Sequence, residues 1–307
     1  MLSSIQAFTD QLAEGWATAR STSWVPPAID TLTEVAVLGL GGSAFGGEVI
    51  RNLLYATSPL PYLIYRGYEV PAHISSKSLV LVSSYSGNTE ETVAAAQLAF
   101  SKGAHLGVIC SGGLLSDWAL ERGLPVFRLP SGFAPRAACA FSITHQLEIV
   151  HRLGLLPDYS HSLQQTIERL NRFSKQSALQ ELAQQLSGKW VALYAEDRIE
   201  SAAIRLRQQI NENAKQLCHH HVIPEMNHNE LVGWPLPAHL ERVFLALRHP
   251  HEHPRNRLRF DFMANEARVL GHPWLELHAE GKDPLGVLLD LIHTGDWLSI
   301  LLAEING

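Results

Sequence analysis

A short apolar run that ends in a hydroxyl-rich loop constrains the fold of this sequence most. Residues 79–82 read Leu-Val-Leu-Val, the composition of a strand buried on both faces of a parallel sheet. The segment 83–92, Ser-Ser-Tyr-Ser-Gly-Asn-Thr-Glu-Glu-Thr, follows directly, and the helix-forming run 93–99 comes next. The sequence therefore predicts a strand, a tight loop and a helix start, with Asn88 and Glu91 as helix-capping residues.

The loop has the chemistry of a phosphate site. A helix N-terminus offers unpaired N–H groups and a partial positive charge. Ser84, Ser86 and Thr89 add hydroxyl donors, and Gly87 lets the backbone approach a ligand closely. The loop contains no lysine, which argues against a nucleotide P-loop. An ordinary polar turn explains the hydroxyl groups equally well when they are considered by themselves.

Apolar runs alternate with helical segments along the whole chain. This order predicts an α/β fold with two units, each a parallel, flavodoxin-like doubly wound sheet flanked by helices. We expect the units at residues 1–153 and 154–307, with 154–161 as a linker. Strands are expected at 35–38, 61–65, 79–82, 107–110, 126–130, 190–194, 243–247 and 274–277. Helices are expected at 3–18, 48–55, 93–99, 136–153, 163–186, 199–216, 255–270 and 285–303.

Two further segments place polar groups where strands of such a sheet end and ligands bind. The turn at 39–47 contains Gly42 and Ser43. A dinucleotide site is a weak interpretation of this turn, because no well-placed acidic residue for a ribose follows. Arg136 follows a proline at a helix start, where the helix dipole disfavours a cation, which indicates an anionic partner. A surface arginine paired with a carboxylate is the alternative.

Composition narrows the class of protein. The chain has 307 residues, 46% hydrophobic and 18% charged residues, and a formal net charge of −6, which argues against a nucleic-acid or anionic-membrane surface. Three cysteines fit a reducing cytosol, so we expect a cytoplasmic protein. Charged residues interrupt the apolar run 285–303, which predicts a packed helix and no membrane span.

The second half carries two candidate proton-transfer groups. Glu212 and His228 are each flanked by asparagines, and together they offer a base and a second proton carrier. By themselves they are more simply a helix-end carboxylate and a loop histidine. The histidines at 219–221 lack the spacing of metal-ligand pairs, so no metal and no cofactor is expected.

Together, these strings closely resemble the bifunctional phosphoglucose/phosphomannose isomerase family of SIS-domain proteins. The resemblance implies interconversion of glucose 6-phosphate or mannose 6-phosphate with fructose 6-phosphate through a cis-enediol(ate). It also implies two SIS-type (sugar isomerase) units and a homodimer whose active sites are shared across the interface. In the implied roles, Glu212 moves a proton between C1 and C2, His228 from the partner assists ring opening, and Arg136 stabilises the enediolate. The residues implied to bind the phosphate are Gly42, Ser43, Ser84, Ser86 and Thr89.

The sequence departs from the family pattern at its end. Family members continue beyond the equivalent of residues 303–307 into a segment with a ring-opening lysine and a threonine, and neither has a counterpart here. We therefore expect phosphate binding to persist and ring opening to be the weaker step. The alternative function is a sugar-phosphate sensor or regulator without turnover. A DNA-binding regulator is a weaker third reading, since no basic or helix-turn-helix segment is appended.

Overall fold

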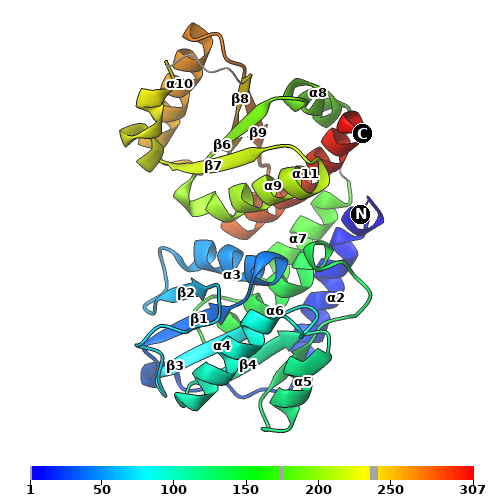
Figure 1. Cartoon of the computed structure of the whole chain (residues 1–307), viewed down its shortest axis with the longest axis vertical. Helices are drawn as coiled ribbons and strands as arrows, with labels where there is room; N and C mark the ends of the chain where they lie inside the picture. Colours follow the sequence, from blue (N-terminus) through cyan, green and yellow to red (C-terminus); the bar gives the residue numbers. More distant parts are fainter. Residues whose placement is uncertain (1, 173–175, 236–240) are drawn as a thin grey trace. The chain divides into compact units, whose positions relative to one another are not determined.

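The chain divides into two compact units, described separately here from a computed structural model (Figure 1). The structure describes residues 2–172, 176–235 and 241–307. One unit comprises residues 6–161, and the other comprises residues 162–307 together with residues 2–5. The units thus divide between residues 161 and 162, a few residues beyond the expected boundary at 153 and 154.

Five parallel strands form the sheet of the 6–161 unit. Their order is β2-β1-β3-β4-β5, the order of a flavodoxin-like doubly wound sheet, and it confirms the predicted fold class. In the register, Leu38 pairs with Tyr65 on one side and with Val82 on the other. The strands are β1 (Glu34–Leu38), β2 (Tyr62–Tyr65), β3 (Ser78–Ser83), β4 (His105–Cys110) and β5 (Val126–Arg128).

Helices cover both faces of this sheet. Alanines of α4 and α5 pack on the face that carries Val80, Val82 and Val108, whereas α3 packs on the opposite face against Val37. The helix expected at 3–18 is in fact two helices, and the helix expected to begin at residue 48 begins at Gly41. The helices of this unit are α2 (Phe8–Ser21), α3 (Gly41–Leu54), α4 (Glu90–Ser101), α5 (Gly113–Leu120) and α6 (Cys139–Arg152), whereas α1 (Leu2–Gln6) falls almost entirely in the other unit.

The second unit repeats the design with one strand fewer. Its parallel strands lie in the order β7-β6-β8-β9. Strand β7 was missed, because it is an edge strand whose centre is a run of half-buried histidines and not an apolar run. The strands are β6 (Trp190–Glu196), β7 (Cys218–Ile223), β8 (Arg242–Arg248) and β9 (Trp274–His278).

The helices of this unit also lie on both faces of its sheet (Figure 1). Phe260 and Met263 of α10 pack on Tyr194 and Phe244, and α9 and α11 cover the other face. The single helix expected at 163–186 is interrupted, and its residues 173–175 lie outside the described residues. The helices are α7 (Ser160–Leu170), α8 (Gln176–Leu186), α9 (Glu200–Asn213), α10 (Pro254–Val269) and α11 (Pro284–Asn306).

Helix α11 is the core helix of this unit. Within the described ranges it is the one helix long and apolar enough to cross a membrane, yet 94% of its most apolar window is buried inside the protein. Asp296 on α11 forms a buried ion pair with Arg205 on α9, with Arg205 Nη2 2.8 Å from Asp296 Oδ2. The predicted packed helix at 285–303 is confirmed.

Strand order also determines where a ligand can bind in the 6–161 unit. From β1 the chain crosses to β2 on one side, and the strands after β3 extend to the other side. The carboxyl ends of β1 and β3 therefore flank the switch point of the sheet, where open α/β sheets bind ligands. The first turn of α3, with Gly42 and Ser43, follows β1, and the loop with Ser84, Ser86 and Thr89 follows β3.

Candidate functional site

A hydrogen bond joins the two loops at the switch point. The Ser43 hydroxyl oxygen accepts a hydrogen bond from the Tyr85 backbone N–H at 2.9 Å. The Ser43 carbonyl accepts a second bond, at 2.7 Å, from the hydroxyl of Ser83, the last residue of β3. Ser43 lies in the first turn of α3, so its position is fixed by the neighbouring strand. Because its oxygen accepts from Tyr85, the Ser43 hydroxyl can still donate its own proton to an anion.

The hydroxyl groups of the second loop are gathered at the start of α4. Ser84 Oγ lies 3.0 Å from Thr89 Oγ1, and the Asn88 backbone N–H donates to Ser86 Oγ at 3.2 Å. Thr89 is the N-cap residue of α4, but its side chain makes no capping hydrogen bond. The loop therefore gathers hydroxyl groups beside a helix N-terminus, the environment that suits a phosphate; Ser86 is exposed, Thr89 is half-buried and Ser84 is buried.

Asn88 has a different role from the one expected. The predicted helix cap at Asn88 is wrong, because its Oδ1 accepts from the backbone N–H of Leu114 at 2.9 Å. This bond ties the loop to the first turn of α5. Gly87 has φ +68°, and a Cβ there would overlap the carbonyl oxygen of Gly112. Only glycine fits this position, because both the backbone angle and the neighbouring chain exclude a side chain.

Arg136 lies at the same end of the sheet. It belongs to the short 3-10 turn Pro135–Ala137, between β5 and α6, and its side chain is half-buried. A Cβ at Gly42 would come within 2.9 Å of the Pro135 carbonyl oxygen and 3.3 Å of Arg136 Cα. The backbone of Arg136 thus packs directly on the start of α3. Within this unit, the structure brings the predicted phosphate residues and Arg136 together.

The other unit contains Glu212, in the last turn of α9. The two flanking asparagines fix this turn. The Asn211 side chain bonds to both the N–H (2.9 Å) and the carbonyl (3.3 Å) of Cys218 at the start of β7, and Asn213 Nδ2 donates to Ser299 Oγ of α11 at 3.0 Å. Lys215 Nζ donates to the Glu212 carbonyl at 2.7 Å, as cations do at helix ends. The Glu212 side chain is exposed on this fixed turn.

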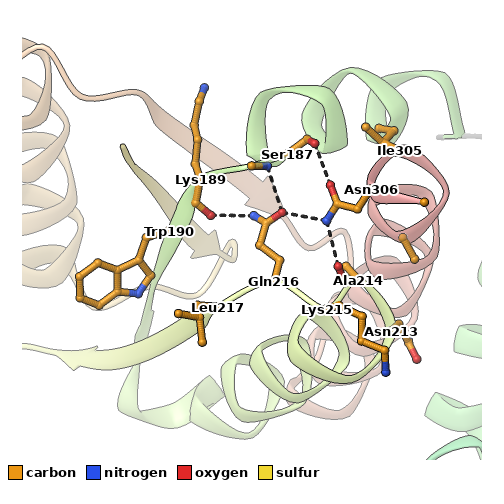
Figure 2. Close-up of a pocket in the computed structure, with 13 residues that line it drawn as sticks. Ser187, Lys189, Trp190, Asn213, Ala214, Lys215, Gln216, Leu217, Ile305 and Asn306 are labelled. Carbon is orange, nitrogen blue, oxygen red and sulfur yellow. Dashed lines mark hydrogen bonds between the residues drawn. The ribbon is translucent and has the colours of Figure 1, made fainter. Parts of the chain in front are cut away.

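A pocket of about 700 Å³ adjoins the turn that carries Glu212 (Figure 2). Gln216 lies at its centre, donates to the carbonyls of Leu186 and Lys189, and accepts from Asn306 Nδ2 at 3.0 Å. Asn306 in turn donates to the Ala214 carbonyl at 2.9 Å. These amides join the ends of α8, α9 and α11, so they hold the Glu212 turn in place from a second side.

The switch point of this second sheet is occupied by the protein's own carboxylate. Glu196 ends β6, is 2% exposed, and accepts from His249 Nε2 (2.8 Å), Asn256 Nδ2 (2.8 Å) and the His253 N–H (2.9 Å). Burial by itself raises the pKa of Glu196, but these hydrogen bonds outweigh it and hold the pKa below its ordinary value. The start of α10 thus binds an internal anion, at the place that corresponds to the hydroxyl-rich loop after β3 in the 6–161 unit.

His228 is exposed at the end of a 3-10 turn, Glu225–His228, and a nearby carboxylate anchors its segment. Glu230 accepts from the Tyr194 hydroxyl at 2.6 Å, from His221 Nδ1 at 2.9 Å and from His219 Nε2 at 3.3 Å. Glu230 was missed in the sequence. The available signal was the alternation of His219 and His221, which places both side chains on one face of a strand.

Glu230 gives this anchor a pH dependence. Burial raises the pKa of Glu230, but hydrogen bonds from His219, Tyr194 and His221 have the larger, opposite effect. The net result lowers the pKa from 4.5 to about 2. A carboxylate with a depressed folded-state pKa stabilises the fold above its unfolded pKa, and the contribution is lost as pH falls from about 4.5 toward 2. Glu230→Gln should therefore reduce the acid dependence of the unfolding free energy, measured by urea denaturation at several pH values. Glu181→Gln, at an exposed site on α8, is the control, and an equal acid slope in wild type and Glu230→Gln would contradict the assignment.

Both units of the chain match models of SIS-domain families. Residues 33–152 match the SIS domain, and residues 175–307 match the bacterial phospho-glucose isomerase C-terminal SIS domain. The C-terminal domain of glucosamine-fructose-6-phosphate aminotransferase from Francisella tularensis has a similar structure, with a TM-score of 0.79 at 13% identity over 100% of this chain and 96% of that one. At this identity the likeness shows the fold alone.

Relatives in sequence are closer. A D-glucosamine-6-phosphate 4-epimerase from Sulfolobus acidocaldarius is 33% identical over 67% of this chain and 65% of the relative. A bifunctional phosphoglucose/phosphomannose isomerase from Caldicellulosiruptor bescii is 31% identical over 99% of this chain and 93% of the relative. An isomerase of the same name from Aquifex aeolicus is 31% identical over 89% of this chain and 85% of the relative. The chain belongs to the bifunctional phosphoglucose/phosphomannose isomerase family.

Proposed function

We propose that this protein interconverts glucose 6-phosphate or mannose 6-phosphate with fructose 6-phosphate. The observation that carries the proposal is the switch point of the 6–161 unit. There Ser43 is bonded to the loop that holds Ser84 and Thr89, and the backbone of Arg136 packs beside them. Hydroxyl groups at two helix starts suit a phosphate, and a neighbouring guanidinium suits a second, developing negative charge. Family membership supports the same substrate class.

The proposed reaction moves one proton between adjacent carbons. Ser43, Ser84, Ser86 and Thr89, with the amide of Gly42, hold the 6-phosphate of the sugar. Glu212 takes the proton from C2 of the open-chain aldose, the C–H electron pair forms the C1–C2 double bond, and Arg136 stabilises the resulting enediolate oxygen. Glu212 then returns the proton to C1, while a proton passes from the C2 oxygen to the C1 oxygen. No cofactor is required, because the substrate is neither oxidised nor reduced overall.

We propose that the working unit is a homodimer, in which His228 of the partner subunit assists ring opening in each site. Support comes from the surface beside His228. A groove lined by Asn227, Leu231, Arg255, Leu258, Arg259 and Phe262 adjoins its segment. Leu258 and Phe262 lie one turn apart on α10 and are 58% and 53% exposed, although both are large and apolar. A second copy that covers this stripe would bring its own groove to the same place, as two-fold symmetry requires.

The phosphate assignment predicts a loss of affinity when two hydroxyl groups are removed. The double substitution Ser86→Ala with Thr89→Ala should weaken fructose 6-phosphate binding by tenfold or more, roughly the loss of one or two hydrogen bonds to a charged group. Isothermal titration calorimetry measures the change. The control is Ser101→Ala with Thr31→Ala, which removes two exposed hydroxyls that bond to backbone carbonyls of the same unit. Wild-type affinity in the Ser86/Thr89 variant would exclude this loop as the phosphate site.

The base assignment predicts a collapse of turnover without a loss of binding. Glu212→Gln keeps the shape of the side chain and removes its basicity, so kcat should fall by about 10²–10⁴-fold. A coupled assay with each aldose phosphate measures kcat, and calorimetry measures the affinity for fructose 6-phosphate, which should stay near that of wild type. Glu181→Gln is the matched control. Near-normal turnover in Glu212→Gln would exclude Glu212 as the base, and absent turnover in wild type with intact binding would favour a sugar-phosphate sensor.

The shared site predicts complementation between inactive chains. Glu212→Gln and His228→Ala should each be impaired alone, and mixing them under conditions of subunit exchange should restore part of the activity, because some mixed dimers contain one intact site. Light scattering at micromolar concentration gives the oligomeric state before and after mixing. Monomers at that concentration, or dimers that exchange subunits without any recovery, would contradict the proposal.

A further inference from the structure

Tyr85 connects its own loop to three other segments at the carboxyl edge of the first sheet. It lies between Ser84 and Ser86 and is 8% exposed. Its backbone N–H donates at 2.9 Å to Ser43 Oγ, in the first turn of α3, which follows β1. Its carbonyl accepts from the N–H (2.9 Å) and the hydroxyl (2.6 Å) of Ser111, in the loop after β4. The backbone of Tyr85 therefore fixes the phosphate loop relative to two neighbouring loops.

The Tyr85 side chain reaches the loop after β5. Its hydroxyl donates to the Pro130 carbonyl at 2.9 Å and accepts from the Phe133 N–H at 2.8 Å. In an ordinary four-residue turn, the carbonyl of the first residue bonds directly to the N–H of the fourth. Here the phenol oxygen is inserted between these two groups. The shape of the turn at 130–133 therefore depends on a side chain from a different loop.

This turn leads directly to Arg136. Phe133 is three residues before Arg136. The short turn that contains Arg136 is closed by a hydrogen bond of 2.8 Å from the Ala137 N–H to the Ala134 carbonyl. On its other side, the backbone of Arg136 packs on Gly42. Arg136 is thus held between the Tyr85 hydroxyl, through Phe133, and the start of α3. A shift of the turn would move the guanidinium relative to the phosphate hydroxyls.

We infer that Tyr85 is a positioning residue that sets the distance between the phosphate hydroxyls and Arg136. The inference rests on the proposed function and deepens it, since the two anionic parts of one sugar phosphate would be bound at a spacing fixed by Tyr85. The loss of its hydroxyl should leave phosphate binding intact and misplace Arg136. A displacement of about 1 Å at a reacting centre can cost roughly 100-fold in rate.

The test compares two buried tyrosines of the same unit. Tyr85→Phe removes the hydroxyl at the turn. Tyr62→Phe is the matched control, because Tyr62 is 6% exposed and its hydroxyl donates to Gln146 Oε1 of α6 at 2.9 Å and not to the turn at 130–133. Both variants should lower the melting temperature. Tyr85→Phe alone should lower kcat by roughly 10- to 100-fold, with KM changed far less.

A double-mutant cycle separates positioning from general damage. In an Arg136→Ala background, Tyr85→Phe should cause little further loss of kcat, because the group that it positions is already gone. A Tyr85→Phe variant with kcat within about twofold of wild type would overturn the inference. An equal loss with and without Arg136 would overturn it too, since Tyr85 would then act independently of Arg136.

The same double-mutant cycle can be measured through ligand affinity in place of turnover. Calorimetry with inorganic phosphate and with 5-phosphoarabinonate, whose carboxylate resembles the enediolate, compares the two anionic parts. Tyr85→Phe should weaken the binding of 5-phosphoarabinonate by roughly tenfold and leave the affinity for inorganic phosphate unchanged. The tenfold effect should vanish in an Arg136→Ala background. Equal weakening of both ligands would overturn the inference. An inactive wild type that still gives the expected binding pattern would reject isomerase function and retain the role of Tyr85.

Discussion

The adjacency of β1 and β3 is the constraint on which the candidate site depends. Parallel strands bring their carboxyl ends to one edge of a sheet, and the chain leaves these two strands in opposite directions. The loops that follow them are separated by about 40 residues in sequence, yet one bond from the Tyr85 N–H to Ser43 Oγ joins them. The turn with Arg136 lies beside that junction, because its backbone packs on Gly42.

The two units show how one fold can be used in two ways. In the 6–161 unit, the switch point presents hydroxyl groups beside the start of α4. In the second unit, the buried carboxylate of Glu196 occupies the corresponding place and satisfies the N–H of His253 at the start of α10. Because this carboxylate already accepts the hydrogen bonds and carries the negative charge, a phosphate is disfavoured there. The second unit contains Glu212 and the segment of His228, and hydrogen bonds from neighbouring elements hold each of them.

Most of the fold follows from local patterns. Residues 79–82 and 107–110 are buried on both faces, so their apolar runs identify the strands directly. Strand β7 carries no such signal, because an edge strand with half-buried histidines lacks the apolar run of a central strand. The start of α3 at Gly41 could not be predicted from the sequence pattern either. It goes together with the close packing of Gly42 on the turn at Pro135, which is a contact between distant segments. Such packing is a property of the tertiary structure.

The side chains of the site were easier to find than their partners. Ser84, Ser86, Thr89 and Arg136 belong to recognisable strings, whereas the role of Asn88 at α5 and the anchor at Glu230 depend on contacts between distant segments. The central claim is that a base carries a proton between C2 and C1. The most direct measurement is prolonged isomerisation of fructose 6-phosphate in deuterium oxide, followed by NMR at C1 and C2. Proton transfer by a base that exchanges with solvent should place deuterium at C1 of the ketose and C2 of the aldose. Isomerisation over many turnovers without deuterium at either carbon would indicate hydride transfer and contradict it.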